Sequence, residues 1–310
     1  VIAPTHEETA TAMARAGVTS YRDLPFTIYQ IQTKFRDETR PRGGLLRVRE
    51  FEMKDAYSFD ADEDGMDRSF QAMVGAYKRI FNRCGLDVVM VDADSGGIGG
   101  KDSNEFVLLT DSGEDRILMS TDSDYAANVE KAEFIKKSFP TEEPGVVEEF
   151  ATPGLKTIEA LAKQEGVSRS KTAKAVFYSV EDEIVIVTIR GDYDVNETKL
   201  RNLLGGSEPR LATGEEVKAA GWVPGSASAV GLIGIRSIVD DSITMGSNYL
   251  AGANKEGFHL RNVNFGRDFK ADILGDIAEA KKGYLSPDGK GKLVVKRGIE
   301  VGHVFKLGNV

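Results

Sequence analysis

The chain is poor in the residue types that build disulfides and metal clusters. Its 310 residues include one cysteine, Cys84, and three histidines, His6, His259 and His303. One cysteine cannot form an internal disulfide, which fits a reducing compartment. The set is also too small for a structural zinc cluster, so no zinc is expected. Cys84 follows a helix-like stretch and is expected to be a small buried residue.

Long apolar runs and an excess of positive charge are also lacking. No segment approaches the roughly 20 apolar residues that cross a bilayer, so no membrane association is expected. The formal net charge of −9 argues against broad, nonspecific binding of nucleic acid but permits a local basic patch. A length of 310 residues is enough for two hydrophobic cores.

Polar and apolar residues alternate along residues 27–38, and a second alternating stretch, residues 47–55, follows a turn at Gly43-Gly44. In the first stretch the even positions from 30 to 38 are polar and the odd ones mostly apolar or β-branched, which predicts that the odd face packs. The polar face could bind a nucleotide through arginine, glutamate and phenylalanine. It could equally be a solvated face with cross-strand charge pairs, and alternation alone leaves both interpretations open.

Other local signals predict helices and a second hairpin. Apolar residues from Met66 to Phe81 recur at helical spacing, which predicts a core-facing helix. Thr157 and Asn196 are expected to cap two helices, and Thr213 with Glu216 forms a capping-box pattern. Residues 175–180 and 184–190 read as a hairpin, residues 141–149 as an acidic linker, and residues 283–291 as a second linker.

Several strings together resemble one enzyme family. Phe35-Arg36-Asp37-Glu38, followed by a loop and Arg47-Val48-Arg49-Glu50-Phe51, is similar to the second signature motif of class II aminoacyl-tRNA synthetases. The strings PTHEE (residues 4–8), MKDAYSF (53–59), SNEF (103–106) and GIEVGHVF (298–305) resemble the bacterial-type prolyl-tRNA synthetases. The strings agree in order over essentially the whole chain.

The resemblance implies an α+β fold with two parts. An incomplete class II antiparallel-sheet catalytic domain is expected at residues 1–134, with a return at 293–310, and an inserted α/β, deacylase-like editing domain at 135–292. Compared with that family, the chain looks like an internal fragment without the first and third signature motifs. Weak activation by this chain alone is therefore expected. The full-length protein is expected to be a cytoplasmic homodimer.

The resemblance also implies a proline-binding site. Thr5 and Glu7 would hold the proline ammonium, and Arg36 would bridge the proline carboxylate and the ATP α-phosphate as the catalytic residue. Gly99 and Gly100 would let the backbone approach the amino acid closely. Positioning and charge neutralisation would carry most of the catalysis.

For ATP, bound with Mg²⁺, the resemblance implies contacts on the same hairpin. Glu38 would accept from the adenine amino group, Arg47 would reach the outer phosphates, and Phe51 would stack on the base. Glu105 is a candidate contact for proline or for Mg²⁺.

In the expected editing domain, the resemblance implies four site residues. Lys174 would bind the 3′ end of the tRNA and act in catalysis, Asp240 and His259 would limit an alanine-sized pocket, and Thr152 would complete the site. The loop Gly221–Gly231 departs from the family, because Ser228-Ala229 stands where a Gly-Pro pair is usual.

The function implied is ligation of proline to its tRNA through prolyl-adenylate, with hydrolysis of mischarged alanyl-tRNA. Two alternatives stay open. The chain could act only as an aminoacyl-tRNA deacylase, because the editing part is the one module that is complete. It could also be a non-enzymatic tRNA-binding paralogue, although a binding protein has no need of an adenylate site.

Overall fold

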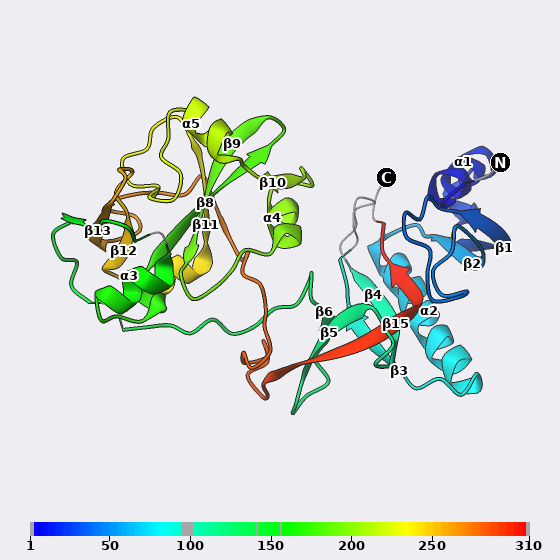
Figure 1. The fold of residues 1–310 in the computed structure, drawn as a ribbon. Helices are drawn as coiled ribbons and strands as arrows, with labels where there is room; N and C mark the ends of the chain where they lie inside the picture. Colours follow the sequence, from blue (N-terminus) through cyan, green and yellow to red (C-terminus); the bar gives the residue numbers. More distant parts are fainter. Residues whose placement is uncertain (1–2, 95–101, 141, 156, 308–310) are drawn as a thin grey trace. The chain divides into compact units, whose positions relative to one another are not determined.

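The computed structural model describes residues 3–94, 102–140, 142–155 and 157–307. They form a mixed α+β structure, as predicted (Figure 1). The chain divides into two compact units, Val1–Val88 with Val304–Val310, and Val89–His303. The expected domain boundaries at residues 134 and 292 stay predictions.

The first unit is built on a long antiparallel hairpin. Its elements are α1 (Glu7–Gly17), a 3₁₀ turn η1 (Tyr21–Asp23), β1 (Phe26–Phe35), β2 (Glu50–Phe59) and α2 (Glu63–Arg83). β1 and β2 pair in register from Phe26 with Phe59 to Phe35 with Glu50. Cross-strand partners project from the same face, so Lys34 lies beside Phe51.

The alternation predicted the two strands correctly but the wrong buried face. Tyr29 and Ile31, on the odd face of β1, are 73% and 68% exposed, whereas Lys34 on the even face is fully buried. The Lys34 ammonium lies 2.8 Å from Oδ1 of Asp55 on the opposite strand. A charge can be buried when it is paired, so the ion pair with Asp55 allows Lys34 to lie on the covered face.

Helix α2 confirms the predicted helix and corrects the expectation for Cys84. The Asp62 carboxylate caps its N-terminus by accepting from the backbone N–H of Gly65, and Phe70 and Phe81 are buried. Ile80, expected in the core, is 49% exposed. Cys84 is exposed rather than buried. It is the C-terminal capping residue, beyond the last buried position of the apolar stripe.

The second unit begins and ends with a closed barrel. Its strands are β3 (Val88–Asp92), β4 (Ser103–Leu109), β5 (Asp115–Ser120), β6 (Ala126–Asn128) and β15 (Leu293–Phe305), in the order β15-β4-β3-β6-β5. β15 pairs antiparallel with β5, so the end of the chain returns to strands formed before residue 130. A Cβ on Gly113 would lie 2.1 Å from the carbonyl oxygen of Gly298, so this close approach requires glycine.

The described residues between β6 and β15 form two further sheets and three helices. The five-stranded sheet has the order β10-β8-β9-β11-β14, and the three-stranded sheet has the order β12-β13-β7. The strands are β7 (Glu148–Ala151), β8 (Ala173–Val180), β9 (Glu183–Arg190), β10 (Pro209–Leu211), β11 (Arg236–Asp240), β12 (Tyr249–Gly252), β13 (Phe258–Val263) and β14 (Ile273–Gly275). The helices are α3 (Ile158–Gln164), α4 (Glu197–Leu203) and α5 (Gly214–Ala219), with 3₁₀ turns η3 (Arg169–Lys171) and η4 (Asp241–Met245).

The predicted hairpin and helix caps in this part are confirmed, whereas the expected linker at residues 141–149 gives way to strand β7 at Glu148. β8 and β9 form the predicted hairpin, and its turn residues Glu181 and Asp182 have φ values of 48° and 66°. Both central residues of a type I′ turn have positive φ, which suits the twist of the flanking strands. Thr157 and Asn196 cap α3 and α4, and the capping box at α5 is present.

Apolar side chains from β9, α4 and β11 form a buried core beside the five-stranded sheet. Val185, Val187, Leu200, Ile238 and Ile277 are fully buried there.

Among the residues described above, no helix has the length and apolar character needed to cross a membrane.

Candidate functional site

The first candidate site lies where the start of α1 meets the end of β1. Thr5 donates its hydroxyl to the carboxylate of Glu7. Arg36 Nε donates to the carbonyl oxygen of Pro4 at 3.2 Å, and its guanidinium lies 5.3 Å from the ring centre of Phe51. The structure thus brings together Thr5, Glu7, Arg36 and Phe51, which the sequence placed in one site.

Glu38 and Arg47 form an ion pair at the tip of the same hairpin. Arg47 Nε lies 2.8 Å from Oε2 of Glu38, and the backbone N–H of Arg40 donates to the other carboxylate oxygen at 3.1 Å. The hydrogen bond from Arg47 lowers the pKa of Glu38. A nucleotide that used both side chains would have to exchange this pair for its own contacts.

Sequence reasoning missed a partly buried polar network on the same hairpin. Asp55 accepts hydrogen bonds from Lys34 Nζ at 2.8 Å, Gln30 Nε2 at 2.8 Å and the Tyr57 hydroxyl at 2.5 Å. Burial opposes ionisation of Asp55, but the hydrogen bonds outweigh it and lower its pKa. Burial raises the pKa of Tyr57, helped by the hydrogen bond to Asp55 and the charge of Glu7. Positions 30 and 34 share a strand face, which was the available signal.

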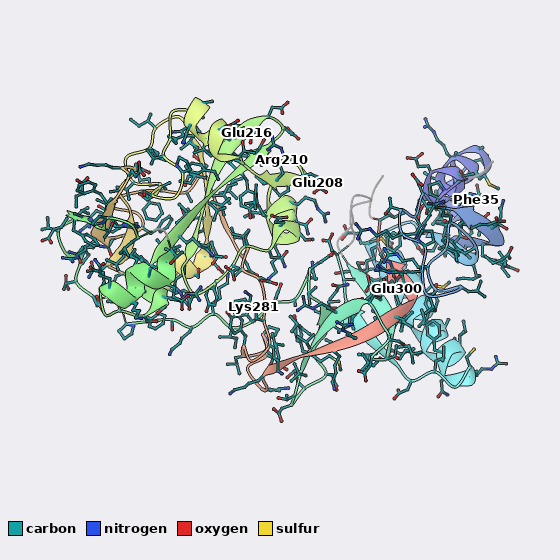
Figure 2. All side chains as sticks on the ribbon, in the orientation of Figure 1. Phe35, Glu208, Arg210, Glu216, Lys281 and Glu300 are labelled. Atoms are coloured by element: carbon teal, nitrogen blue, oxygen red, sulfur yellow. The ribbon has the colours of Figure 1, made fainter. Side chains whose placement is uncertain are left out.

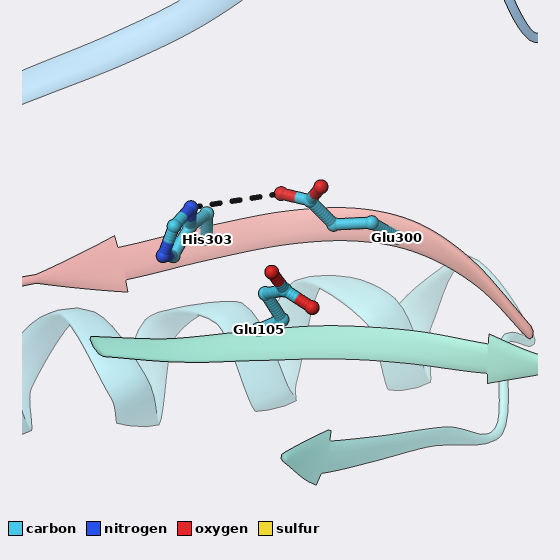
Figure 3. Close-up of side chains that lie close together, drawn as sticks. All are labelled: Glu105, Glu300 and His303. Carbon is cyan, nitrogen blue, oxygen red and sulfur yellow. Dashed lines mark ion pairs between the residues drawn. The ribbon is translucent and has the colours of Figure 1, made fainter. Parts of the chain in front are cut away.

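Glu105 lies with Glu300 and His303 on neighbouring barrel strands (Figure 3). Possible ligand atoms of the three lie within 4.8 Å of one another, so they could hold a divalent cation. Burial and then the charge of Glu300 raise the pKa of Glu105 to about 7. The Nε2 atom of the His303 ring lies 2.6 Å from Ser103 Oγ. Gly99 and Gly100 lie outside the described residues.

The second candidate site is on the three-stranded sheet β12-β13-β7. His259 is 7% exposed, and its Nδ1 lies 2.6 Å from the hydroxyl oxygen of Thr152. Burial lowers the pKa of His259, which favours a neutral imidazole. His259 is the cross-strand partner of both Gly252 and Phe150. The structure therefore joins two of the four predicted editing residues.

Lys174 points its ammonium to a different set of partners. Its Nζ donates to Asp194 Oδ1 at 2.7 Å and to the carbonyl oxygen of Tyr193 at 2.9 Å. Lys281, labelled in Figure 2, lies 2.5 Å from the other oxygen of Asp194. The hydrogen bonds of the two lysines lower the pKa of Asp194 to about 2. Lys174 is 24% exposed in its side chain, so it stays accessible to an anionic partner.

Asp240 is fully buried in a charge network that sequence reasoning missed. Its carboxylate accepts from Lys136 Nζ, from the backbone N–H of Ser242 and from the backbone N–H of Ile277, each at 2.9 Å. Lys136 also pairs with Asp241, and with Asp276 at 2.6 Å. These bonds tie Asp240 to the segment that precedes β7, and its role in an aminoacyl pocket stays a prediction.

Known proteins match this chain in two ways, over the editing region and over nearly its whole length. Residues 152–269 match the family described as aminoacyl-tRNA editing domain. The chain is 56% identical over 308 residues to a "Proline--tRNA ligase" of Dehalococcoides mccartyi, covering 99% of this chain and 54% of that protein. It is 48% identical over 311 residues to the protein of the same name from Thermoanaerobacter sp., covering 99% and 55%.

The solved structure of a hypothetical protein covers 43% of this chain and 92% of its own, at 22% identity and a TM-score of 0.37. The chain spans about half the length of the curated relatives it matches. The match covers 99% of this chain, so it includes both the hairpin site and the editing region. The chain therefore belongs to the prolyl-tRNA synthetase family and contains an aminoacyl-tRNA editing domain.

Proposed function

We propose that this chain carries the proline- and ATP-binding hairpin of a proline–tRNA ligase, within an antiparallel-sheet catalytic domain of the class II type. The observation that carries the proposal is the position of Arg36, which contacts both the Pro4 carbonyl beside the Thr5–Glu7 pair and the ring of Phe51. One guanidinium at that point can face an amino acid on one side and a nucleotide on the other.

The proposed reaction is attack of the proline carboxylate on the ATP α-phosphate, with pyrophosphate leaving. Thr5 and Glu7 hold the proline ammonium, and Arg36 neutralises the carboxylate and the α-phosphate together. Glu38 accepts from the adenine amino group, Arg47 reaches the outer phosphates, and Phe51 stacks on the base. No side-chain nucleophile is needed, because aligned reactants and screened charge supply the acceleration.

Glu105 is proposed as a further contact for proline or for the Mg²⁺ that accompanies ATP. Its approach to Glu300 and His303 gives it the oxygen and nitrogen neighbours that a divalent cation binds. Gly99 and Gly100 are proposed to admit the amino acid close to the backbone.

We also propose that the second site hydrolyses alanyl-tRNA. A pocket that fits proline rejects the smaller alanine by only about 1–3 kcal/mol, so a second site is needed to remove the error. The match of residues 152–269 to editing domains and the bond between Thr152 and His259 support this. Water attacks the ester carbonyl, activated by the ribose hydroxyl of the substrate, and releases alanine and tRNA. Lys174 binds the tRNA 3′ end, and Asp240 and His259 limit the pocket.

The proposed partners are proline-specific tRNA, proline and ATP, and the proposed assembly is a homodimer in the cytoplasm. The two alternatives give different results in the same assays. A deacylase alone would hydrolyse alanyl-tRNA without activating proline, and a binding paralogue would bind tRNA without either activity.

The test of activation uses the chain extended to the length of its relatives. Proline-dependent ATP–pyrophosphate exchange is expected, and Arg36→Ala is expected to lower it by at least about 100-fold, since charge-assisted contacts to both substrates are lost. Arg15→Ala, in the last turn of α1, is the matched control. Exchange driven by another amino acid, and not by proline, would disprove the proposed activation.

The test of editing uses the 310-residue chain itself with alanyl-tRNA. Hydrolysis is expected, and Lys174→Ala is expected to slow it through weaker binding of the tRNA end. An unchanged rate in Lys174→Ala would remove Lys174 from the site.

A further inference from the structure

Asn254 holds the loop Ser226–Val230 by three hydrogen bonds. Its backbone N–H donates to the carbonyl oxygen of Ser226 at 2.8 Å. Its side-chain oxygen accepts from the backbone N–H of Ser228 at 2.9 Å, and its side-chain nitrogen donates to the carbonyl oxygen of Val230 at 2.8 Å. All three partner atoms belong to the loop backbone, so the grip does not depend on the loop's side chains.

The loop lies on the face of the sheet that carries His259. A Cβ built on Gly252 would lie 2.3 Å from the carbonyl oxygens of Ser226 and Ala227, so the loop backbone sits directly on this glycine. Gly252 is the cross-strand partner of His259. Cross-strand partners project from the same face, so the loop backbone and the imidazole share one side of the sheet.

We propose that Asn254 is a positioning residue that fixes this loop as one wall of the editing site, and so sets which aminoacyl group enters. The inference deepens the proposed deacylase function and rests on it. A wall made of backbone atoms held at a fixed distance from His259 limits the space for a side chain. Loosening it admits a larger aminoacyl group, such as the proline ring.

The backbone grip also accounts for the unusual sequence of the loop. Ser228-Ala229 replaces the Gly-Pro pair of the family, yet neither side chain takes part in the three bonds to Asn254. The N–H of residue 229 is not used by Asn254, so proline and alanine are both compatible with the grip at that position.

Besides its hydrogen bonds to the loop, Asn254 has an unusual backbone conformation, and a test must separate the two effects. Its φ of 54° lies in the left-handed region, which asparagine and glycine tolerate. Asn254→Gly keeps that conformation and the backbone bond to Ser226, and removes only the two side-chain bonds. Asn262→Gly is the matched control, because Asn262 has a φ of 58° and donates to the carbonyl oxygen of Val146, outside the loop.

The experiment compares amide hydrogen exchange and deacylation in the 310-residue chain and its two variants. In Asn254→Gly the segment 224–232 is expected to exchange about tenfold faster or more, because the acceptor of the Ser228 amide is lost. The ratio of alanyl-tRNA to prolyl-tRNA hydrolysis is expected to fall by about tenfold. Asn262→Gly is expected to leave both readouts at their original values.

Unchanged exchange in the segment 224–232 would overturn the proposed grip. A loosened loop with an unchanged ratio of the two substrates would overturn its role in selectivity. If the unmodified chain hydrolyses neither ester, the proposed function fails instead, and the exchange comparison still decides whether Asn254 holds the loop.

Discussion

The Lys136 ammonium lies 2.9 Å from the Asp240 carboxylate, and the two side chains are 4% and 0% exposed. Burial disfavours the charged form of Lys136, but Asp240, Asp241 and Asp276 outweigh it and raise the pKa of the lysine. Lys136 therefore keeps its charge although it is buried, and that charge depends on the surrounding carboxylates in place of water.

Replacing Lys136 by methionine is expected to destabilise the second unit by about 3–5 kcal/mol, because Asp240 would be left buried without its cation. Urea unfolding followed by the fluorescence of Trp222, the single tryptophan, measures this. Lys255→Met is the control. Lys255 pairs with Glu149 at the surface, where such pairs contribute about 0–1 kcal/mol. Equal losses in the two variants would contradict the account.

The Lys136–Asp240 pair also shows where prediction from the sequence ends. The caps at Thr157, Asn196 and Thr213 could be predicted because each bond joins residues three positions apart. Lys136 and Asp240 are 104 positions apart, and nothing local marks that lysine as buried. Long-range pairing of charges is set by the tertiary fold and leaves no periodic trace in the chain.

The candidate sites also contain features that the sequence predicts and features that it does not. In the first site, Thr5, Glu7 and Arg36 could be placed together because motif strings define the positions. The buried face of β1 could not be predicted, because alternation shows which residues are polar but not which polar residues form hydrogen bonds or ion pairs with each other. The loop held by Asn254 was flagged only as a departure in sequence, and its backbone contacts became visible only in three dimensions.

Glu105 is expected to make the stability of the second unit fall as the pH rises. Its pKa is raised from 4.5 to about 7. Between these pH values the folded chain keeps a proton on Glu105 that the unfolded chain has lost. The contribution of Glu105 to stability therefore decreases across this window and is constant on either side of it. Glu105→Gln resembles the protonated form. Compared with the unmodified chain, it is expected to gain up to about 3 kcal/mol at pH 8 relative to pH 4.5, at about 1.4 kcal/mol per pKa unit.

Urea unfolding at the two pH values, followed by circular dichroism, measures this difference. Glu143→Gln, at an exposed position, is the control and is expected to show no such dependence. A pH-independent difference between Glu105→Gln and the unmodified chain would show that Glu105 ionises normally.

Thr152→Val is expected to slow alanyl-tRNA hydrolysis by about 2–12-fold, because it removes a hydrogen bond of about 0.5–1.5 kcal/mol that orients the His259 ring. Valine has nearly the same shape, so packing changes little. Single-turnover deacylation measures the rate. Thr244→Val, at an exposed hydroxyl on η4, is the control. A rate equal to that of the unmodified chain would mean that His259 does not need Thr152 for its orientation.

Tyr57→Phe is expected to weaken proline binding more than ATP binding. The Tyr57 hydroxyl donates to Asp55 at 2.5 Å, and the backbone of His6, between Thr5 and Glu7, hydrogen-bonds the same oxygen. The phenol thus links the strand network to the segment proposed to hold the proline ammonium. Loss of one or two such bonds is expected to raise the KM for proline by about 5–20-fold in pyrophosphate exchange by the extended chain. Tyr29→Phe, on the exposed face of β1, is the matched control. A proportional rise in the KM for both substrates would instead point to a general loosening of the hairpin.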